Sequence, residues 1–236
     1  MISTNALIAK FQYAIDNHWG YIWGQAGAVW TEAKQKAATR EQTVQYGSQW
    51  IGHRVADCSG MFYWAFKELG SYMYHGSDTM YRKYCTANGT LNGGKRTDGL
   101  PLIPGTAVFV WKPEDQKYGH VGLYIGNGKV IEAQGTKAGV IYSDVSNKKW
   151  TNWGELKDVD YGAEPTPVPP VPTGYAEVTG KRVALRKAPT TQASIIMRIN
   201  TGEIVKLETP PPSEWDYVSY QGHVGYMMKE FLHEGG

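Results

Sequence analysis

A mostly apolar segment runs from Met61 to Leu69 and is followed directly by Gly70. Its length and the glycine at its end predict a buried helix. Asp57 precedes the segment and is a good N-cap residue, because its carboxylate can accept hydrogen bonds from the free N–H groups of the first helical turn. Cys58 is therefore expected on the first turn of this helix.

Two further apolar segments, residues 121–125 and 129–133, flank the turn sequence Gly126-Asn127-Gly128. This pattern predicts two antiparallel strands joined as a hairpin. His120 opens the first strand and Glu132 lies on the second. A side chain on a strand is held more rigidly than one on a loop, so both residues are well placed for chemistry that needs fixed geometry.

The length of the turn decides which side chains share a face of this hairpin. A two-residue turn would place Glu132 on the sheet face opposite His120. A three-residue loop places Gly122 opposite Glu132, and it brings His120, Glu132 and Gln134 to one face. We expect the three-residue loop.

Residues 164–173 are rich in proline and predict a semi-rigid, extended spacer. The sequence after the spacer consists of short β-rich segments separated by turns, which is typical of a small barrel. The 236 residues are therefore expected to form one domain over residues 1–162, a linker over 163–174 and a small all-β domain over 175–236. The expected strands of the second domain are 183–186, 195–199, 203–207, 215–220 and 225–227.

Charge and composition exclude several classes of function. A net charge of +2 is too small to indicate binding to nucleic acid or to a membrane surface. No apolar run approaches the length that spans a membrane. The six histidines and two cysteines are scattered without ligand pairs, and Asp144, Asp158 and Asp160 have no histidine at a suitable spacing. We expect no metal and no other cofactor.

A thiol at a helix N-terminus and an imidazole on a strand together suit a cysteine nucleophile and its general base. The free N–H groups and partial positive charge of a helix N-terminus stabilise a thiolate and can hold an oxyanion. Cys58 and His120 are the candidates. Glu132 would accept the second imidazole N–H of His120 and fix its tautomer, and Gln134 is the alternative third residue.

These residues resemble the NlpC/P60 family of papain-like cysteine peptidases, which cut peptidoglycan stem peptides. The resemblance covers roughly residues 5 to 160 and implies an α+β, papain-like catalytic domain with an antiparallel sheet. Glu132 stands where the family most often has a second histidine. Three motifs match in order: Tyr21-Ile22-Trp23-Gly24, Asp57-Cys58-Ser59-Gly60 and the segment 119–129.

The resemblance also implies residues that contact the substrate. Tyr21 is expected beside Cys58, with its hydroxyl as a candidate donor to the oxyanion. Asp57 and Ser59 are implied to help hold the free amino group of the stem peptide. Arg54 lies just before the nucleophile and would suit a substrate carboxylate, with a solvated surface arginine as the alternative.

An insertion from Ala26 to Ala56 occupies a place where the family has a short loop. A helix is expected within it around residues 31–38. Because the insertion lies beside the expected active site, it should reshape the substrate groove.

The expected reaction is hydrolysis of a stem-peptide bond, by resemblance the bond between D-glutamate and the diamino acid, either lysine or diaminopimelate. The alternatives are an N-acetylmuramoyl-L-alanine amidase with the same Cys-His chemistry, a wall-binding protein with weak or no activity, and an enzyme that transfers the acyl group to a lipid or an amine. Residues 175–232 resemble a bacterial SH3 domain (SH3b), of a kind that commonly binds cell-wall peptides.

The second cysteine, Cys85, is expected to be a free thiol in a loop-rich segment over residues 81–99, because a disulfide with Cys58 would consume the nucleophile. The N-terminus shows no charged region before a long apolar stretch, so no secretory signal is expected. Action at the cell wall or outside the cell would then fit a phage or prophage lysin that is released when the membrane is permeabilised, or a component of a conjugation or tail apparatus.

Overall fold

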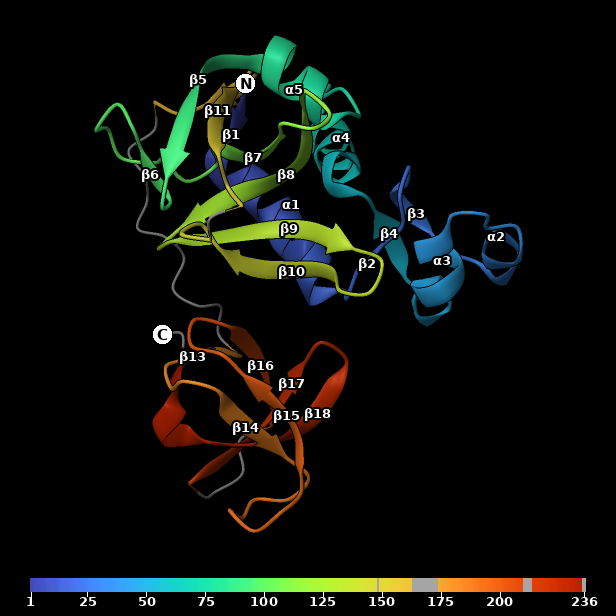
Figure 1. Ribbon diagram of the computed structural model, residues 1–236, viewed down its shortest axis with the longest axis vertical. Helices are drawn as coiled ribbons and strands as arrows, with labels where there is room; N and C mark the ends of the chain where they lie inside the picture. Colours follow the sequence, from blue (N-terminus) through green and yellow to red (C-terminus); the bar gives the residue numbers. More distant parts are fainter. Residues whose placement is uncertain (148, 163–173, 210–213, 235–236) are drawn as a thin grey trace. The chain divides into compact units, whose positions relative to one another are not determined.

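The computed structural model describes residues 1–147, 149–162, 174–209 and 214–234 (Figure 1). The chain divides into two compact units, Met1–Val168 and Pro169–Gly236. Apart from Gly174, the linker predicted over residues 163–174 lies outside the described residues. The predicted domain limits and the spacer therefore stay predictions.

The helix predicted from the apolar segment is confirmed as α4, Cys58–Glu68. Asp57 is its N-cap, and the Asp57 carboxylate accepts the backbone N–H of Gly60 at 2.7 Å. Gly70 follows the helix with a φ of +73°, a left-handed conformation that costs glycine little. The other helices of the first unit are α1 (Thr4–Asp16), α2 (Glu32–Lys36), α3 (Glu41–Tyr46), α5 (Ser77–Tyr84) and the 3-10 helix η1 (Gly47–Trp50).

A seven-stranded sheet forms the centre of the first unit, with the strand order β10-β9-β8-β7-β11-β5-β6 (Figure 1). Apolar residues of α1 and α4 pack on one face of it, where Phe11 and Phe62 meet Leu123 and Ile131 in a single buried cluster. The predicted α+β class is confirmed. The strands are β5 (Cys85–Asn92), β6 (Lys95–Arg96), β7 (Ala107–Lys112), β8 (Lys117–Gly126), β9 (Lys129–Gly135), β10 (Gly139–Asp144) and β11 (Asn152–Leu156).

The hairpin of β8 and β9 has the predicted register but a different turn. Only Asn127 and Gly128 connect the strands, with φ values of +46° and +77°, as a tight Asn-Gly turn requires. The three-residue loop was therefore wrong. A register shift between Tyr124 and Gly126 supplies the missing residue as a bulge, so Leu123 pairs with Ile131.

Gly122 and Glu132 consequently lie side by side, as the three-residue loop would also have placed them. A Cβ atom added to Gly122 would lie 3.3 Å from the Cβ atom of Glu132 and 2.6 Å from a methyl group of Val130. The close packing at this position leaves room for glycine alone. Register past the bulge thus brings Glu132 to the face that carries His120.

The insertion folds as a small layer of its own. Its strands β3 (Ala26–Val29) and β4 (Arg54–Ala56) join β2 (Gly20–Tyr21) in a three-stranded sheet with the order β2-β4-β3. The helix predicted around residues 31–38 is α2, which Thr31 caps through its side chain. The strand β4 leads directly into Asp57 and α4, so the insertion is connected without a loop to Cys58.

The segment over residues 81–99 is not rich in loops as expected. It holds the end of α5, the strand β5 and the strand β6. The sequence of β5, Cys-Thr-Ala-Asn-Gly-Thr-Leu-Asn, contains few β-formers, and its pairing with β11 makes it a strand. Cys85 is a free thiol, as predicted, and burial raises its pKa to about 12.

The first unit is closed by two short strands, β1 (Ile2–Ser3) and β12 (Val159–Asp160), which pair in parallel. Within the described part of the chain, no helix is both long and apolar enough to cross a membrane.

The second unit is all-β, as predicted. Its seven strands form an antiparallel sheet with the order β15-β14-β18-β17-β16-β13-β19, and a cluster that includes Leu185, Val205 and Val218 is buried within it. Its likeness to an SH3b domain stays a prediction. The strands are β13 (Tyr175–Val178), β14 (Val183–Arg186), β15 (Ile195–Ile199), β16 (Ile204–Thr209), β17 (Trp215–Tyr220), β18 (His223–Met228) and β19 (Leu232–Glu234), with the 3-10 helix η2 (Lys229–Phe231) before the last.

Candidate active site

Cys58 is the first residue of α4 and is only 9% exposed. The Asp57 cap satisfies the N–H of Gly60, while the position of the thiol at the helix N-terminus places it in the positive end of the helix dipole. A thiolate is stabilised at such a place, and a neighbouring oxyanion would be as well.

His120 on β8 and Glu132 on β9 form a short contact between neighbouring strands. The distance from His120 Nε2 to Glu132 Oε2 is 2.6 Å, and the Glu132 side chain is fully buried. Gln134, the alternative third residue, is exposed. The structure therefore brings Glu132, and not Gln134, to the imidazole.

Cys58 completes this group. Burial works against the His120 imidazolium, but hydrogen bonds with Cys58 and with Glu132, and the charges of both, outweigh it and raise the pKa of His120 to about 9. Since Glu132 takes Nε2, Nδ1 is the ring nitrogen left for the thiol. At neutral pH the imidazole of His120 is thus charged, with an acidic partner on each side.

Lys149 is a fourth member that the sequence did not reveal. Its Nζ lies 2.5 Å from Glu132 Oε1, so the carboxylate has one cation on each oxygen. Burial opposes the charge on Glu132, but the hydrogen bond and charge of His120, followed by those of Lys149, lower the pKa of Glu132 to about 2. A fully buried carboxylate is stable here because it has two partners.

Trp150 covers the imidazole. Its ring is stacked on that of His120 at 5.6 Å between centroids and 22° between planes, and Lys149 Nζ lies 4.6 Å from the same indole ring. Trp150 is itself almost completely buried. One indole thus restricts the ring of His120 and shields its contact with Glu132 from water, which strengthens the electrostatic interaction.

Asp57 does more than cap α4. Its Oδ2 accepts the N–H of Gly24 at 2.7 Å, its Oδ1 accepts the Ser59 hydroxyl at 3.2 Å, and His75 Nε2 lies 2.9 Å from each oxygen. Burial opposes ionisation, but His75 and the backbone donors outweigh it and lower the pKa of Asp57. The hydrogen bond to Asp57 in turn raises the pKa of His75.

The binding of a substrate amino group by Asp57 and Ser59 stays a prediction. The structure shows that such binding would require a change in the contacts of Asp57. Both oxygens of Asp57 already interact with groups of the protein, and Ser59 donates to Asp57 itself. An incoming ammonium group would have to displace His75, which occupies the same carboxylate.

We expect Asp57→Ala to lower the free energy of unfolding by about 2–3 kcal/mol at pH 6, because it removes a helix cap and leaves His75 without its partner. The loss should be smaller at pH 9. The pKa of His75 is higher in the folded protein than in the unfolded chain, where it is about 6.5. The ion pair of His75 with Asp57 therefore stabilises the fold fully below about pH 6.5, and this stabilisation is lost as the pH rises through the pKa of the folded state. Urea unfolding at both pH values measures this.

Asp115→Ala is the matched control for this prediction, since Asp115 is exposed and its ion pair is with Lys117, which is also exposed. It should change the free energy of unfolding by less than about 0.5 kcal/mol. An equally small effect of Asp57→Ala would show that the contacts of Asp57 do not stabilise the fold.

The sequence profile of the NlpC/P60 family matches residues 41–155. The chain contains an NlpC/P60 domain. The matched part includes Cys58, His120, Glu132 and Lys149, and it begins after Tyr21. No curated protein matches the chain at a significant level.

Solved structures of NlpC/P60 proteins resemble the chain at low identity. The NlpC/p60 domain of the peptidoglycan hydrolase SagA is 16% identical with a TM-score of 0.41, over 65% of this chain and 98% of that one. The peptidoglycan hydrolase RipB from Mycobacterium tuberculosis is 21% identical with a TM-score of 0.38, over 65% and 68%. RipD from the same organism, described as a non-catalytic NlpC/p60 domain protein adapted to peptidoglycan binding, is 18% identical with a TM-score of 0.39, over 64% and 95%.

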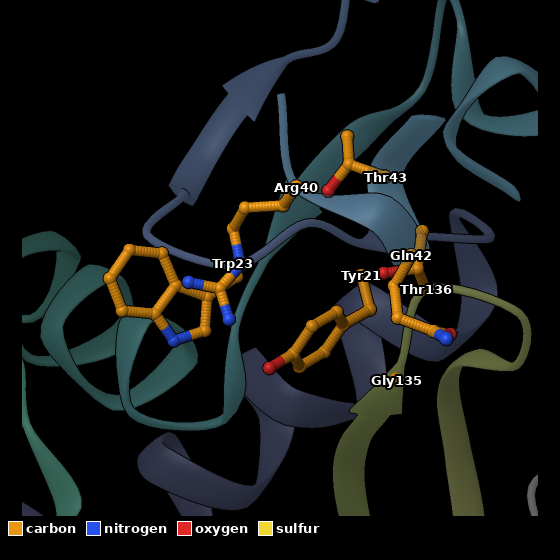
Figure 2. A pocket seen from close by; sticks show the side chains of 7 residues that line it. All are labelled: Tyr21, Trp23, Arg40, Gln42, Thr43, Gly135 and Thr136. Carbon is orange, nitrogen blue, oxygen red and sulfur yellow. The ribbon is translucent and has the colours of Figure 1, made fainter. Parts of the chain in front are cut away.

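Tyr21 pairs with Ala56, two residues before Cys58, and its role at the site stays a prediction. Burial, followed by the negative charges of Cys58 and Asp57, raises the pKa of Tyr21, so its phenol keeps a proton that it can donate. Tyr21 also lines a pocket of about 190 Å³ together with Trp23, Arg40, Gln42, Thr43, Gly135 and Thr136 (Figure 2).

Arg54 does not line this pocket. It is exposed on β4, where its guanidinium donates to the carbonyl of Gly27 at 2.9 Å and lies 5.7 Å from the ring of Trp19. The arginine that lines the pocket is Arg40, which the insertion supplies. The binding of a substrate carboxylate by Arg54 stays a prediction, but the structure places its guanidinium on the backbone of β3.

Proposed function

We propose that the protein is a cysteine endopeptidase that hydrolyses peptidoglycan stem peptides at the bacterial cell wall. The observation that carries the proposal is the linked group of Cys58, His120 and Glu132 within the part of the chain that matches the NlpC/P60 family. That family acts on peptidoglycan and consists largely of cysteine hydrolases, although it also has non-catalytic members. A thiol paired with a charged imidazole is ready for nucleophilic attack.

The first half of the proposed reaction forms a thioester. The Cys58 thiolate attacks the scissile carbonyl carbon, and the π electrons of the carbonyl move to its oxygen. First-turn N–H groups of α4 and the Tyr21 hydroxyl stabilise this oxyanion, since the raised pKa of Tyr21 keeps it protonated. As the C–N bond breaks, His120 transfers its proton to the leaving amine.

The second half releases the acyl group by the same steps in reverse. The neutral imidazole of His120 removes a proton from water, and the resulting hydroxide oxygen attacks the thioester carbon. The C–S bond breaks, the acid is released, and Cys58 and His120 regain their ion pair. Glu132 keeps the imidazole oriented throughout, because it holds Nε2 while Nδ1 exchanges the proton.

The bond that we propose joins the γ-carboxyl group of D-glutamate to the diamino acid of the stem. Its support is the resemblance of the three motifs to the NlpC/P60 family. We propose in addition that the second unit is an SH3b-like module that binds the wall and keeps the catalytic domain near its substrate. The competing reaction is cleavage of the muramoyl–alanine amide by the same residues.

Digestion of purified peptidoglycan followed by mass spectrometry of the soluble fragments tests the proposal. The endopeptidase should produce fragments with a new N-terminus on the diamino acid and a free γ-carboxyl group on glutamate. Release of intact stems with a new L-alanine N-terminus would instead establish the amidase. A preparation from cells without the gene controls for contaminating hydrolases, and binding without any new fragments would identify a wall-binding protein.

A further inference from the structure

The pocket beside Tyr21 is built partly by the insertion. The insertion supplies Arg40, Gln42 and Thr43, Trp23 comes shortly before it in the chain, and Gly135 and Thr136 lie at the end of β9 (Figure 2). Tyr21 pairs with Ala56 on the neighbouring strand β4, two residues before Cys58, so the pocket begins close to the proposed nucleophile. A substrate held at Cys58 would therefore extend into it.

The walls of the pocket are held firmly. Trp50 Nε1 donates to the carbonyl of Thr136 at 2.6 Å, which ties the end of β9 to the insertion. On the other side, Gln35 accepts the indole N–H of Trp30 at 2.9 Å and donates to the carbonyl of Thr43 at 3.0 Å. These bonds connect α2 to α3, so the backbone that carries Arg40 is held in place by hydrogen bonds within the insertion.

Arg40 points into this pocket with its charge unpaired. Its guanidinium carbon lies 4.0 Å from the centroid of the Trp23 ring, and Figure 2 shows the planar group lying against the indole. Trp23 is 56% exposed, so its ring is accessible to a ligand from solvent. Among the residues that the structure describes, no carboxylate forms an ion pair with Arg40.

A guanidinium that is stacked on an indole keeps its N–H groups free at the edge of its plane. The stacking limits the rotation of the side chain, so less conformational entropy is lost when it binds a ligand. The geometry of the free edge matches a carboxylate, which can accept two parallel hydrogen bonds. Tyr21 adds a hydroxyl to the lining, and its raised pKa keeps this hydroxyl protonated.

We propose that Arg40 and Trp23 form a subsite for a free carboxylate on the acyl side of the scissile bond. This inference rests on the proposed endopeptidase function. A γ-glutamyl bond leaves the α-carboxylate of the same residue free. Three carbon atoms, Cγ, Cβ and Cα, separate this carboxylate from the scissile carbonyl carbon. The subsite therefore distinguishes stem peptides with this carboxylate from stems in which it is an amide.

Two synthetic tripeptides test the subsite, L-Ala-γ-D-Glu-L-Lys and the same peptide with the α-carboxylate converted to its amide. The wild-type protein should cleave the carboxylate peptide with a kcat/KM at least about tenfold higher than that of the amide. In Arg40→Gln this ratio should fall to near one, mainly because KM for the carboxylate peptide rises. Arg40→Lys should retain part of the preference, since it keeps the charge without the planar fork.

Lys36→Gln is the matched control. Lys36 is an exposed cation on α2 in the same insertion, and it does not line the pocket, so its loss changes the net charge equally and should keep the tenfold preference. Equal cleavage of both peptides by the wild-type protein would overturn the subsite. A preference that survives in Arg40→Gln would overturn it as well.

Binding separates this inference from the proposed function. Calorimetric titration of Cys58→Ala with both peptides measures the subsite without turnover. If neither peptide is cleaved but the carboxylate peptide binds at least about tenfold more tightly, and Arg40→Gln removes the difference, the endopeptidase proposal fails and the subsite stands. Equal binding of both peptides would overturn the subsite regardless of activity.

Discussion

Cys58→Ala is expected to lower kcat for stem-peptide cleavage by at least about 10⁴-fold, because it removes the atom that forms the acyl-enzyme. The fold should survive the change. Cys58 is a small side chain at the start of α4, and alanine is tolerated there without the loss of the Asp57 cap. Initial rates on a labelled stem peptide, together with the far-UV circular dichroism spectrum, measure both effects.

Cys85→Ala is the matched control for the loss of a thiol. Burial raises the pKa of Cys85 to about 12, so this sulfur stays protonated and unreactive at neutral pH. Its replacement should leave turnover within about twofold of the wild type. Full activity of Cys58→Ala, or loss of activity only in Cys85→Ala, would contradict the assignment of the nucleophile.

The parts of the site that the sequence predicted have signals that are local along the chain. One short segment contains the cap at Asp57, the apolar run after it and Gly70. These features together predict where α4 begins and ends. His120 and Glu132 belong to one hairpin, so a single register decides whether they meet. Local patterns of this kind can be read without knowledge of the rest of the fold.

The turn of that hairpin shows the limit of such patterns. Two arrangements give the same register: a three-residue loop, or an Asn-Gly turn with a bulge nearby. The choice depends on how β8 bends between Tyr124 and Gly126, which is determined by its neighbours in the sheet. The pairing of Glu132 with His120 could be predicted, whereas the backbone that produces it could not.

The remaining members of the site come from distant segments. Lys149 and Trp150 lie between β10 and β11, and His75 precedes α5, so no spacing along the chain connects them to the residues that they contact. The sequence indicates Arg54 as a substrate ligand because it lies just before Cys58 in the chain. The β-strand conformation carries its side chain to Gly27, and Arg40 from the same insertion reaches the pocket instead.

Glu132→Gln should lower kcat by about 10²–10³-fold while the fold and the Cys58 thiol are retained. The amide has nearly the same shape, but it can no longer stabilise the imidazolium through its charge. The pKa of His120, which is about 9 with the carboxylate in place, should fall toward the ordinary value of about 6.5. The alkaline limb of the kcat/KM profile should therefore move to lower pH.

Gln134→Ala is the control for Glu132→Gln. It should change turnover by less than about twofold, since Gln134 is exposed.

Lys149→Met should shift the pKa of His120 in the opposite direction to Glu132→Gln, so it tests the electrostatic explanation directly. Lys149 partly neutralises Glu132, and without it the full negative charge acts on the imidazolium. The pKa of His120 should rise, which moves the alkaline limb to higher pH, and turnover should fall less than tenfold because the contact between His120 and Glu132 remains. If Glu132 only filled space beside the ring, both variants would leave the alkaline limb where it is. A shift in the same direction in both variants would contradict the assigned charges, because one removes the anion that faces His120 and the other removes the cation that balances it.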